Sequence, residues 1–461
     1  MAKYPEYLLF SYALLSAKSF VCTPQNYDEI LGCIDYAKNN SLKICVAGSR
    51  QSFSNVCLIK ENISIDIRKL NNILNFDEEN QEVTVQSGIL TADLLIFLLS
   101  KGFILNGLTG SLQNTIAGEI ASDVNGKDSW KNGNFGENVV GLKLITASGN
   151  ILNIQKNEDP DTLNAVIGGL GLTGVIIEVT LKICCVSSLI LRTQSIKVQN
   201  INELTEAMFS ATKTEIDFAY CWTDPFAPRD FLGRGFCEVA AFDNADEKLT
   251  AREMLKGFKQ KTKIGPFKPE IFWALFRKID FAIAYQIAGY AKFYLSRNKK
   301  RKISFPEYQY PMVKIFPKWN LKYHPHGFRE WQILFETENF EAAYKEVIRL
   351  CRTHKFTPYI CAVRKHKKQT PFLSFAGNGF SMTVNYGMND HPTERRIKFE
   401  NELTRLVLDY KGKVYLAKYP FLSKQVVEKM YPQFSFFLDV KNKIDSENLF
   451  WSDAAESIFA K

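Results

Sequence analysis

The apolar residues of the first 185 positions follow two periods in turn, one helical and one strand-like. At 25–39, Ile30, Ile34 and Ala37 recur at helical spacing, whereas 63–70 alternates between apolar and polar positions. Read in this way, the pattern predicts helices at 25–39 and 91–102, strands at 42–48, 63–70 and 83–89, and a hairpin at 138–154. Helices therefore alternate with strands through this part of the chain.

Beyond residue 190 the alternating segments become longer. The pattern predicts strands at 216–224, 234–242, 330–337, 359–366 and 379–386, with a helix at 340–354 among them. Several antiparallel strands with helices on one face are typical of an α+β domain. We therefore expect an α+β protein whose parts are a first domain at 1–185 (subdomains at about 1–75 and 76–185), a second domain at 186–411, and a segment at 412–461 that returns to the first domain.

Composition adds bounds on the chemistry. The chain has 461 residues and a net charge of +9, which suits an anionic partner. Its ten cysteines are scattered through apolar runs without a C-x-x-C pair, so we expect reduced core residues in a cytoplasmic protein. All five histidines lie at or after His324, which argues against a metal centre of His and Cys ligands.

Two segments raise the question of a membrane. The apolar run within 1–24 is interrupted by Lys3, Glu6 and Lys18, which favours an element of the fold over a signal peptide. The aromatic segment 264–302 has apolar residues at helical spacing and ends in five cations within 297–302. Either it lies in a membrane interface or it is a core helix followed by a solvated basic turn, and both interpretations stay open. No run reaches the roughly 20 apolar residues of a spanning helix.

Two loops rich in small residues, 44–58 and 109–135, each follow an apolar segment. Positions such as Gly110, Ala117 and Gly126 are expected to leave backbone N–H groups uncovered for an anion. A flexible surface loop would explain one such stretch, but two of them indicate one large anionic cofactor. The G-x-G-x-x-G fingerprint of dinucleotide-binding folds is absent near the N-terminus, so the cofactor must be held in another way.

Four motifs carry a resemblance to a known family. The segment GSRQSFS (48–54) resembles the pyrophosphate loop of FAD oxidoreductases of the vanillyl-alcohol oxidase type, and AGEIASDVNGK (117–127) resembles G-G-x-I-A-x-D-x-H-G-K of the decaprenylphosphoryl-ribose 2′-oxidase family. The GGLGLTGVII run in 165–183 and the end of 434–453 resemble further motifs of the same flavoproteins. The resemblance implies a two-part FAD-binding domain of that type and an antiparallel-sheet substrate cap domain.

The resemblance also implies the cofactor contacts. Backbone amides of 48–54 would bind the FAD pyrophosphate, with the hydroxyls of Ser49, Ser52 and Ser54 as further donors, while the Arg50 side chain would reach a phosphate or point to solvent. Gln51 stands where relatives carry a tethering histidine, so we expect non-covalent FAD. The expected cofactor-binding residues are Ala47, Gly48, Ser49, Arg50, Gln51, Ser52, Phe53, Ser54, Gly110, Thr115, Ile116, Ala117, Gly118, Ser122, Asn125, Gly126, Lys127, Ile176 and Tyr415.

Lys418, in VYLAK, resembles the active-site lysine of a Y-x-x-K motif, with Tyr415 beside the flavin. Hydride transfer to flavin N5 places charge on the ring and releases a hydroxyl proton, and a lysine can stabilise the charge or take the proton. A lysine facing water at a strand edge is the alternative. By motif, the expected substrate-binding residues are Lys127, Gln332, Lys365, Thr383 and Asn385. Asn125 departs from the pattern, because an amide replaces histidine.

These expectations lead to one main function and two alternatives. The main one is oxidation of a sugar secondary hydroxyl, the 2′-hydroxyl of a polyprenyl-phosphate-linked pentose, as the first half of an epimerisation. The resemblance then implies a short-chain reductase partner, quinone or oxygen as electron acceptor, and a cytoplasmic enzyme in peripheral contact with the membrane, without nucleic acid. The alternatives are an aldonolactone or free-sugar oxidase and a non-catalytic lipid-binding or scaffold protein.

Overall fold

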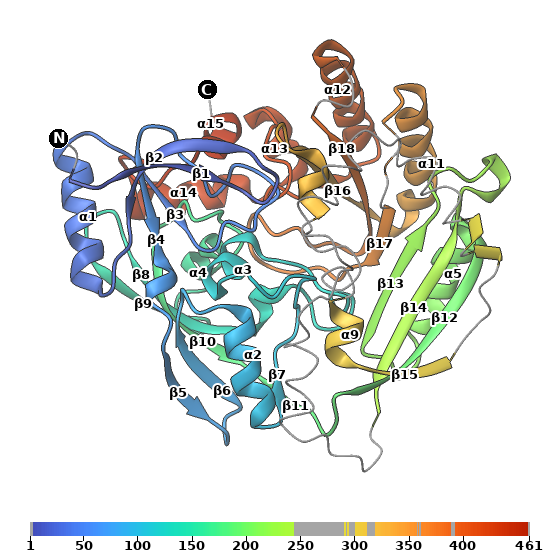
Figure 1. Cartoon of the computed structure of the whole chain (residues 1–461), viewed down its shortest axis with the longest axis horizontal. Coiled ribbons are helices and arrows are strands. Elements are labelled where there is room, and N and C mark those ends of the chain that lie inside the picture. Colours follow the sequence, from blue (N-terminus) through green and yellow to red (C-terminus); the bar gives the residue numbers. More distant parts are fainter. Residues whose placement is uncertain are drawn as a thin grey trace, which may run out of the picture.

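A computed structural model describes residues 3–243, 290–291, 293–294, 300–310, 319–356, 358, 361–388 and 392–459. Its strands form three larger sheets and one short ladder, and the helices lie between and outside them (Figure 1). The chain is thus a mixed α/β protein with antiparallel sheets, in agreement with the predicted α+β class.

The first sheet contains the N-terminal hairpin. Its order is β1-β2-β4-β3, in which β2, β3 and β4 run parallel and β1 is antiparallel to β2. Its elements are β1 (Glu6–Phe10), β2 (Ser16–Cys22), β3 (Ile44–Ala47), β4 (Ile63–Asp66) and the covering helix α1 (Tyr27–Asn39). The apolar run within 1–24 is therefore an element of the fold, as expected, and takes the form of two strands.

The second sheet is antiparallel throughout, with the order β5-β6-β10-β8-β9. Its strands are β5 (Ile73–Asp77), β6 (Glu82–Gln86), β8 (Val139–Ile145), β9 (Ile151–Gln155) and β10 (Val175–Lys182). The helices α2 (Thr91–Ser100), α3 (Ile116–Ser122) and α4 (Pro160–Val166) and the short strands β7 (Phe103–Ile104) and β11 (Cys184–Cys185) complete this part. The expected division at about residue 75 falls within β5.

The third sheet has the order β15-β12-β14-β13-β17-β18-β16-β19, with antiparallel neighbours. Its strands are β12 (Ile190–Asn200), β13 (Phe218–Thr223), β14 (Gly233–Phe242), β15 (Lys300–Ser304), β16 (Phe328–Glu336), β17 (Cys361–Lys365), β18 (Gly379–Gly387) and β19 (Lys413–Val414). Strand β19, which pairs with β16, lies just beyond the expected boundary at 412.

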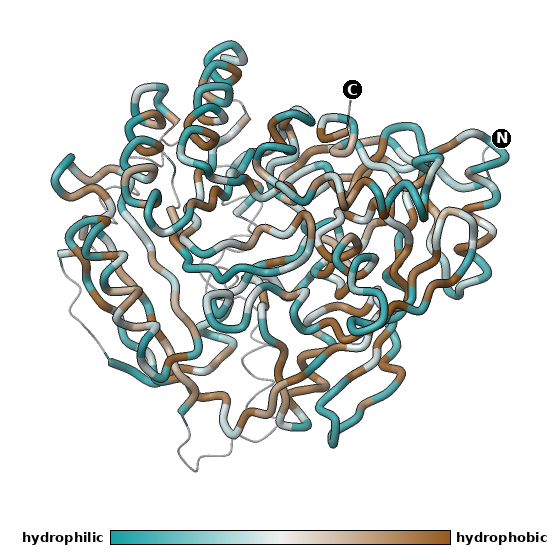
Figure 2. Tube along the Cα trace, turned by 180° about the vertical axis from the view of Figure 1, so that it is seen from behind, coloured by the Kyte–Doolittle hydropathy of each residue, from teal (hydrophilic) through white to brown (hydrophobic). Residues whose placement is uncertain are grey.

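Three helices cover one face of this third sheet: α5 (Ile201–Ala211), α11 (Thr337–Thr353) and α12 (Thr393–Asp409). Their apolar sides join the strands in one buried cluster that includes Trp331, Phe340 and Phe380. Hydrophobic and hydrophilic stretches alternate along the trace of these helices (Figure 2), as expected when one side of a helix is buried and the other is exposed. The other face of the sheet is turned toward the first domain and toward α9 (Phe305–Gln309).

The chain ends with α13 (Lys424–Met430), α14 (Phe434–Ile444) and α15 (Asp453–Phe459). Between α14 and α15 it passes beside β3, where Ile44 N donates to Leu449 O and Trp451 N donates to Ile44 O, both at 2.8 Å. Buried Asp445 holds this passage, since its carboxylate pairs with Lys441 at 2.9 Å and accepts the N–H groups of Leu449 and Phe450. The C-terminal segment thus lies against the first sheet.

The structure also places the cysteines and the segments considered for membrane or metal contact. All ten cysteines are free, and all but Cys184 and Cys185 are buried. Most of 264–302 lies outside the described residues; at its end Lys302 Nζ pairs with Asp243 at 2.6 Å. Within the described ranges, no helix is long and apolar enough to cross a membrane, and no group of three or more His, Cys, Asp and Glu side chains could hold a metal ion.

Candidate active site

The two loops of small residues meet at Gly48, directly after β3. A Cβ atom at this position would lie 2.1 Å from Thr115 Oγ1. Thr115 is the N-cap of α3, and its hydroxyl accepts a hydrogen bond from Gly118 N at 3.2 Å. Only glycine lets the first loop pass the start of α3, so the two loops form one surface.

The first loop presents backbone donors without acceptors. The N–H groups of Ser49, Arg50, Gln51 and Phe53 have no acceptor in the described part of the chain, and Arg50 has a left-handed backbone with φ of 54°. Successive N–H groups around such a turn make an anion-binding concavity. The loop therefore fits the pyrophosphate of FAD.

The serine hydroxyls of this loop have acceptors within the protein. Ser52 Oγ donates to Ala417 O at 3.1 Å and Ser54 Oγ donates to the same oxygen at 2.8 Å. These two bonds use the hydroxyl protons of Ser52 and Ser54, and the expected donation to the pyrophosphate stays a prediction. They join the first loop to the segment that carries Lys418.

Arg50 reaches neither a phosphate nor solvent. Its guanidinium donates to Asp66 Oδ2 at 3.1 Å and to Ser64 Oγ at 3.2 Å, and its side chain is 11% exposed. Both partners lie on β4, where Asp66 pairs with Ala47. Arg50 therefore anchors the loop to the sheet, while Gln51 Nε2 donates locally to Ser49 O at 3.2 Å.

The second loop has fewer open amides than its sequence suggested. The N–H groups of Ile116, Ala117 and Gly126 all donate to acceptors within the first domain, which corrects the expectation for these positions. Gly110 differs, since its N–H has no described acceptor and a Cβ there would meet nothing within 4 Å. Ile176 packs in the core on β10, with its carbonyl accepting from a neighbouring serine hydroxyl. This loop mainly shapes the surface that the first loop completes.

The turn that follows β19 carries the expected catalytic residues. Tyr415 N donates to Gln332 O at 2.9 Å, and Tyr415 Oη donates to Ser122 O at 2.7 Å. Three residues on, Lys418 Nζ forms an ion pair with Glu330 Oε1 at 2.5 Å. Glu330 was missed by sequence reasoning, although its place two residues before Gln332 on an alternating strand was a usable signal.

The strand period separates a polar face of the sheet from an apolar one. Gln332 on β16 pairs with Thr383 on β18, and Glu330 pairs with Asn385. Together with Ser381, these side chains share the face that is turned away from α11 and α12. Expected substrate residues Gln332, Thr383 and Asn385 thus lie on one surface with the Lys418 and Glu330 pair.

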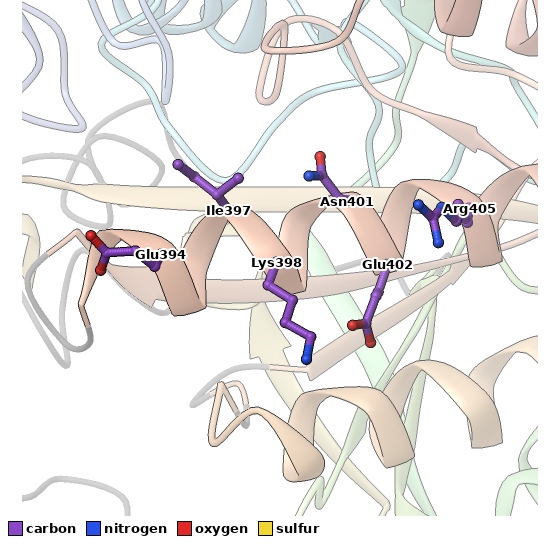
Figure 3. A pocket seen from close by; sticks show the side chains of 6 residues that line it. All are labelled: Glu394, Ile397, Lys398, Asn401, Glu402 and Arg405. Atoms are coloured by element: carbon purple, nitrogen blue, oxygen red, sulfur yellow. The ribbon is translucent and has the colours of Figure 1, made fainter.

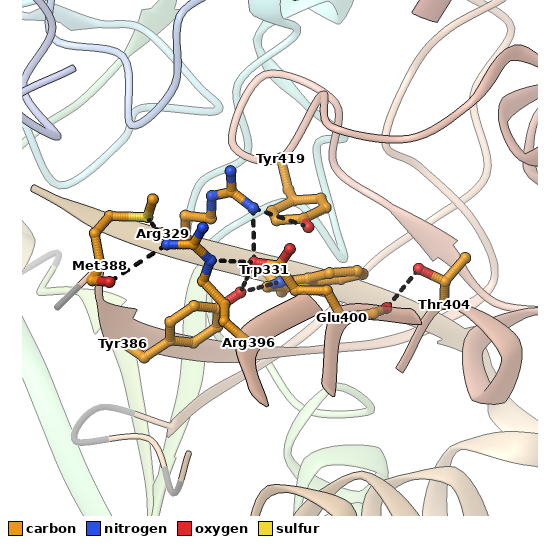
Figure 4. Close-up of polar contacts among 8 residues, drawn as sticks. All are labelled: Arg329, Trp331, Tyr386, Met388, Arg396, Glu400, Thr404 and Tyr419. Carbon is orange, nitrogen blue, oxygen red and sulfur yellow. Dashed lines mark hydrogen bonds and ion pairs between the residues drawn. The ribbon is translucent and has the colours of Figure 1, made fainter. Parts of the chain in front are cut away.

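The opposite face of β16 holds this surface in place (Figure 4). Trp331 stacks on Tyr419 with ring centroids 3.8 Å apart. Arg329 pairs with buried Glu400 at 2.6 Å, and Arg396 lies 3.8 Å from the same carboxylate. Because Tyr419 follows Lys418 directly, this packing fixes the turn relative to the strand.

Comparisons with known proteins give this geometry a context. The family model described as "FAD binding domain" matches residues 18–155, and that described as "D-arabinono-1,4-lactone oxidase" matches residues 324–458. The first therefore covers the loop at 48–54 and the second covers Lys418. The chain is an FAD-dependent oxidoreductase.

Individual relatives of this oxidoreductase differ in name. It is 25% identical over 401 residues to decaprenylphosphoryl-beta-D-ribose oxidase of Mycolicibacterium smegmatis, covering 86% of this chain and 84% of that protein. It is 23% identical to L-gulonolactone oxidase of Mus musculus, covering 96% and 97%. D-arabinono-1,4-lactone oxidase of Eremothecium gossypii is 23% identical over 46% of this chain and 40% of that protein. These relatives act on sugars and their lactones.

Asn125, the main departure from the family motif, lies in a buried hydrogen-bond network. Its Oδ1 accepts from Arg364 at 2.8 Å and from Gln332 at 3.0 Å. Gln332 Nε2 also donates to Ser381 Oγ at 3.2 Å, and that hydroxyl lies 2.8 Å from His366 Nε2. Burial lowers the pKa of His366 to about 3, so the imidazole is neutral. Neither Arg364 nor His366 was expected from the sequence.

Lys127 is not placed to hold a substrate phosphate as expected. It is 7% exposed, and its Nζ lies 4.5 Å and 4.3 Å from the ring centroids of Tyr220 and Tyr308. The ammonium donates to the carbonyls of Tyr308 and Gln309 at the end of α9. Burial holds the pKa of Lys127 well below its usual range. The lysine therefore ties α9 to the second loop.

Lys365 lies on the wrong face for the expected substrate contact. Its Nζ donates to Thr212 Oγ1 at 3.0 Å and lies over the ring of Phe209, on the side covered by α5. The neighbouring residue Arg364 faces Asn125 instead. Because successive strand residues point to opposite faces, an offset of one residue exchanged the two.

The depression found along α12 is separate from this site (Figure 3). It has a volume of about 490 Å³ and is lined by Glu394, Ile397, Lys398, Asn401, Glu402 and Arg405. Glu402 there contacts His354 of α11 at 2.9 Å. Since all six residues belong to α12, which covers the other face of the sheet, the depression is separate from the surface that carries Lys418 and Glu330.

Gly48→Ala should weaken FAD binding by about tenfold or more, because the added methyl pushes Thr115 away and spoils the amide cradle. The dissociation constant can be measured by quenching of flavin fluorescence. Gly32→Ala on α1 is the matched control, since a Cβ there meets nothing within 4 Å. Unchanged FAD affinity in Gly48→Ala would show that the two loops need not touch.

Glu119→Gln tests a buried carboxyl that supports the second loop. Glu119 Oε1 accepts from Asn114 at 3.1 Å, and burial raises the pKa of Glu119 to about 8. The folded state keeps its proton up to that pH while the unfolded chain releases it near 4.5. The contribution of the protonated Glu119 side chain to the free energy of unfolding is therefore complete below the pKa of the unfolded chain. This contribution is lost as the pH rises to about 8.

Urea denaturation across this pH range should show the difference. Relative to wild type, Glu119→Gln should gain about 4 kcal/mol of unfolding free energy between pH 4.5 and 8, since each pKa unit is worth about 1.4 kcal/mol. Glu79→Gln, on the surface, removes a charge without removing a buried carboxyl. A constant difference between Glu119→Gln and wild type at every pH would contradict the raised pKa.

Proposed function

We propose that this oxidoreductase oxidises a secondary hydroxyl of a sugar, the 2′-hydroxyl of a polyprenyl-phosphate-linked pentose, to the ketone as the first half of an epimerisation. The observation that carries the proposal is the pairing of Lys418 with Glu330 beside Gln332 and Asn385, in a chain that aligns over 86% of its length with a decaprenylphosphoryl-ribose oxidase. Such a surface places a proton acceptor and hydrogen-bonding side chains around one hydroxyl.

The fold assigned with this function has a two-part FAD-binding domain of the vanillyl-alcohol oxidase type, made by the first two sheets. The eight-stranded sheet with its helices is then the substrate cap. FAD is held without a covalent link, since Gln51 replaces the tethering histidine and no histidine precedes His324. The match of the FAD-binding model to 18–155 supports this division.

FAD, when bound, supplies the acceptor for the hydride that leaves the carbinol carbon. The protein must then hold the sugar and take the hydroxyl proton. Lys418 Nζ forms a short ion pair with the Glu330 carboxylate, with 2.5 Å between the two atoms, and only 9% of the Glu330 side chain is exposed. The ammonium stabilises negative charge at the reacting centre, and the carboxylate accepts the proton.

Charge at the site supports an anionic substrate. Arg364 has no carboxylate in ion-pair contact among the described residues, whereas Lys418 has Glu330. Arg364 lies on the substrate face and can pair with a phosphate through its guanidinium. A lactone has no charge to balance such a surplus, whereas a polyprenyl phosphate sugar does.

A neutral aldonolactone is the second candidate. It is favoured by the match of the lactone oxidase model to residues 324–458, which include both Glu330 and Lys418. The two candidates share the hydride and proton steps and differ in the anionic group. With the first substrate, the enzyme works at the cytoplasmic face of the membrane, quinone or oxygen accepts the electrons, and a short-chain reductase completes the epimerisation.

The substrate is tested by mixing the FAD-loaded enzyme anaerobically with each candidate in detergent. We expect a polyprenyl-phosphoryl pentose to bleach the visible flavin band, and the same pentose phosphate without its lipid to do so more slowly, since it lacks binding energy from the chain. Bleaching by L-gulono- or D-arabinono-lactone but not by either phosphate would replace the first candidate with the second.

Lys418→Ala and Glu330→Gln test the proposed proton step in single-turnover flavin reduction. We expect Lys418→Ala to slow reduction by about 10²–10³-fold while FAD stays bound, because the cradle lies elsewhere. Glu330→Gln keeps a hydrogen-bond acceptor for Lys418 but removes the base, so reduction should slow in this variant as well. Lys424→Ala, on α13, is the control. Wild-type reduction by Lys418→Ala would remove this residue from the mechanism.

A further inference from the structure

The edge strand β1 exposes large apolar side chains. Tyr7 and Leu8 are each 54% exposed and Phe10 is 50% exposed, which places three exposed apolar residues within one strand of five. Leu8 pairs across the hairpin with Lys18, which is also exposed. A patch of this kind at a sheet edge marks an interaction surface or an aggregation hazard.

The hairpin is anchored on its inner side, so the patch is not a loose terminus. Leu9 packs on a small cluster formed by Ala17, Ala47, Cys57 and Leu58. Ala47 ends β3 directly before the FAD cradle. The outer side chains Leu8 and Phe10 therefore project from a frame that is continuous with the cofactor site.

A lane of aromatic rings runs from this hairpin to Lys418. Two residues after Phe10, Tyr12 N donates to Ser52 O at 3.1 Å and the Tyr12 ring stacks on Phe53 at 5.5 Å. Phe53 also packs on Phe328 at 5.3 Å, and Lys418 Nζ lies 5.1 Å from the Phe53 ring centroid. Ring contacts thus extend from Tyr12, two residues beyond the exposed strand, to Lys418.

We propose that the outer face of the β1 and β2 hairpin, with Leu8, Phe10 and Lys18, rests on an anionic lipid bilayer, and that the aromatic lane leads the lipid-linked substrate from the bilayer to Lys418. The second clause rests on the proposed function; the first does not need it. Aromatic and aliphatic side chains can enter the acyl boundary while the lysine stem reaches the headgroups.

Lipid fits this face better than a second protein chain. In a protein interface the ammonium of Lys18, beside Leu8, would have to leave water against an apolar partner, which is costly. At an anionic membrane the same ammonium remains hydrated and contributes about 1 kcal/mol. The net charge of +9 acts in the same direction.

The test uses the full FAD-loaded chain and vesicles of phosphatidylcholine with or without phosphatidylglycerol, in the absence of substrate. We expect wild type to sediment with the anionic vesicles, and Leu8→Ser with Phe10→Ser to lower the partition coefficient by about tenfold or more. Lys18→Gln should have a smaller effect that disappears in high salt. Leu74→Ser with Ile397→Ser is the matched control, because these residues are 46% and 49% exposed on β5 and α12.

Unchanged flavin absorbance and thermal unfolding would show that the variants remain folded. Failure of wild type to bind vesicles, or equal binding by the Leu8 and Phe10 variant, would overturn the proposal. Light scattering that shows a dimer for wild type and a monomer for this variant, without vesicle binding, would assign the face to a second copy instead. Because no sugar is present, these results do not depend on the identity of the substrate.

Discussion

The carbonyl of Ala417 is the point on which the site depends. Ser52 and Ser54 of the first loop both donate to it, at 3.1 and 2.8 Å, although they lie more than 360 residues away in the sequence. Tyr415, on the same turn, is held through its amide and its hydroxyl. Lys418 therefore has a fixed position relative to the cofactor cradle. The conformational entropy of the turn is lost when the chain folds, so it is not lost again when substrate binds.

The eight-stranded sheet gives this turn its partners through the strand period alone. Along β16, Trp331 faces the helices and stacks on Tyr419, while its neighbours Glu330 and Gln332 face the first domain. The contact between Trp331 and Tyr419 therefore sets the distance between the strand and the turn. It thereby also sets the distance from the turn to the polar residues on either side of Trp331. A well-packed core on one face of the sheet is what makes the geometry of the other face precise enough for proton transfer.

Local patterns in the sequence were enough to find the loops, most strands and the lysine, because periodicity and small residues act over a few positions. They failed where an outcome depends on a distant partner. Arg50 was expected to reach a phosphate or to point to solvent, but it pairs with Asp66 on the neighbouring parallel strand. Lys127 was expected at the substrate, but α9, more than 170 residues later, buries it. Lys365, and not Arg364, was expected at the substrate. Which of two successive strand residues faces the site depends on the register with β18, and an offset of one residue exchanges them.

The replacement of histidine by Asn125 has a consequence for where the proton goes. Oδ1 of Asn125 accepts from both Arg364 and Gln332, so its amide nitrogen is turned away from them and serves as a donor. His366, two hydrogen bonds further along, is kept neutral by burial. The network can therefore orient a substrate but does not accept a proton at neutral pH. The ion pair of Lys418 and Glu330 lies on the same face of the sheet, and under the function proposed above it is this pair that takes the hydroxyl proton.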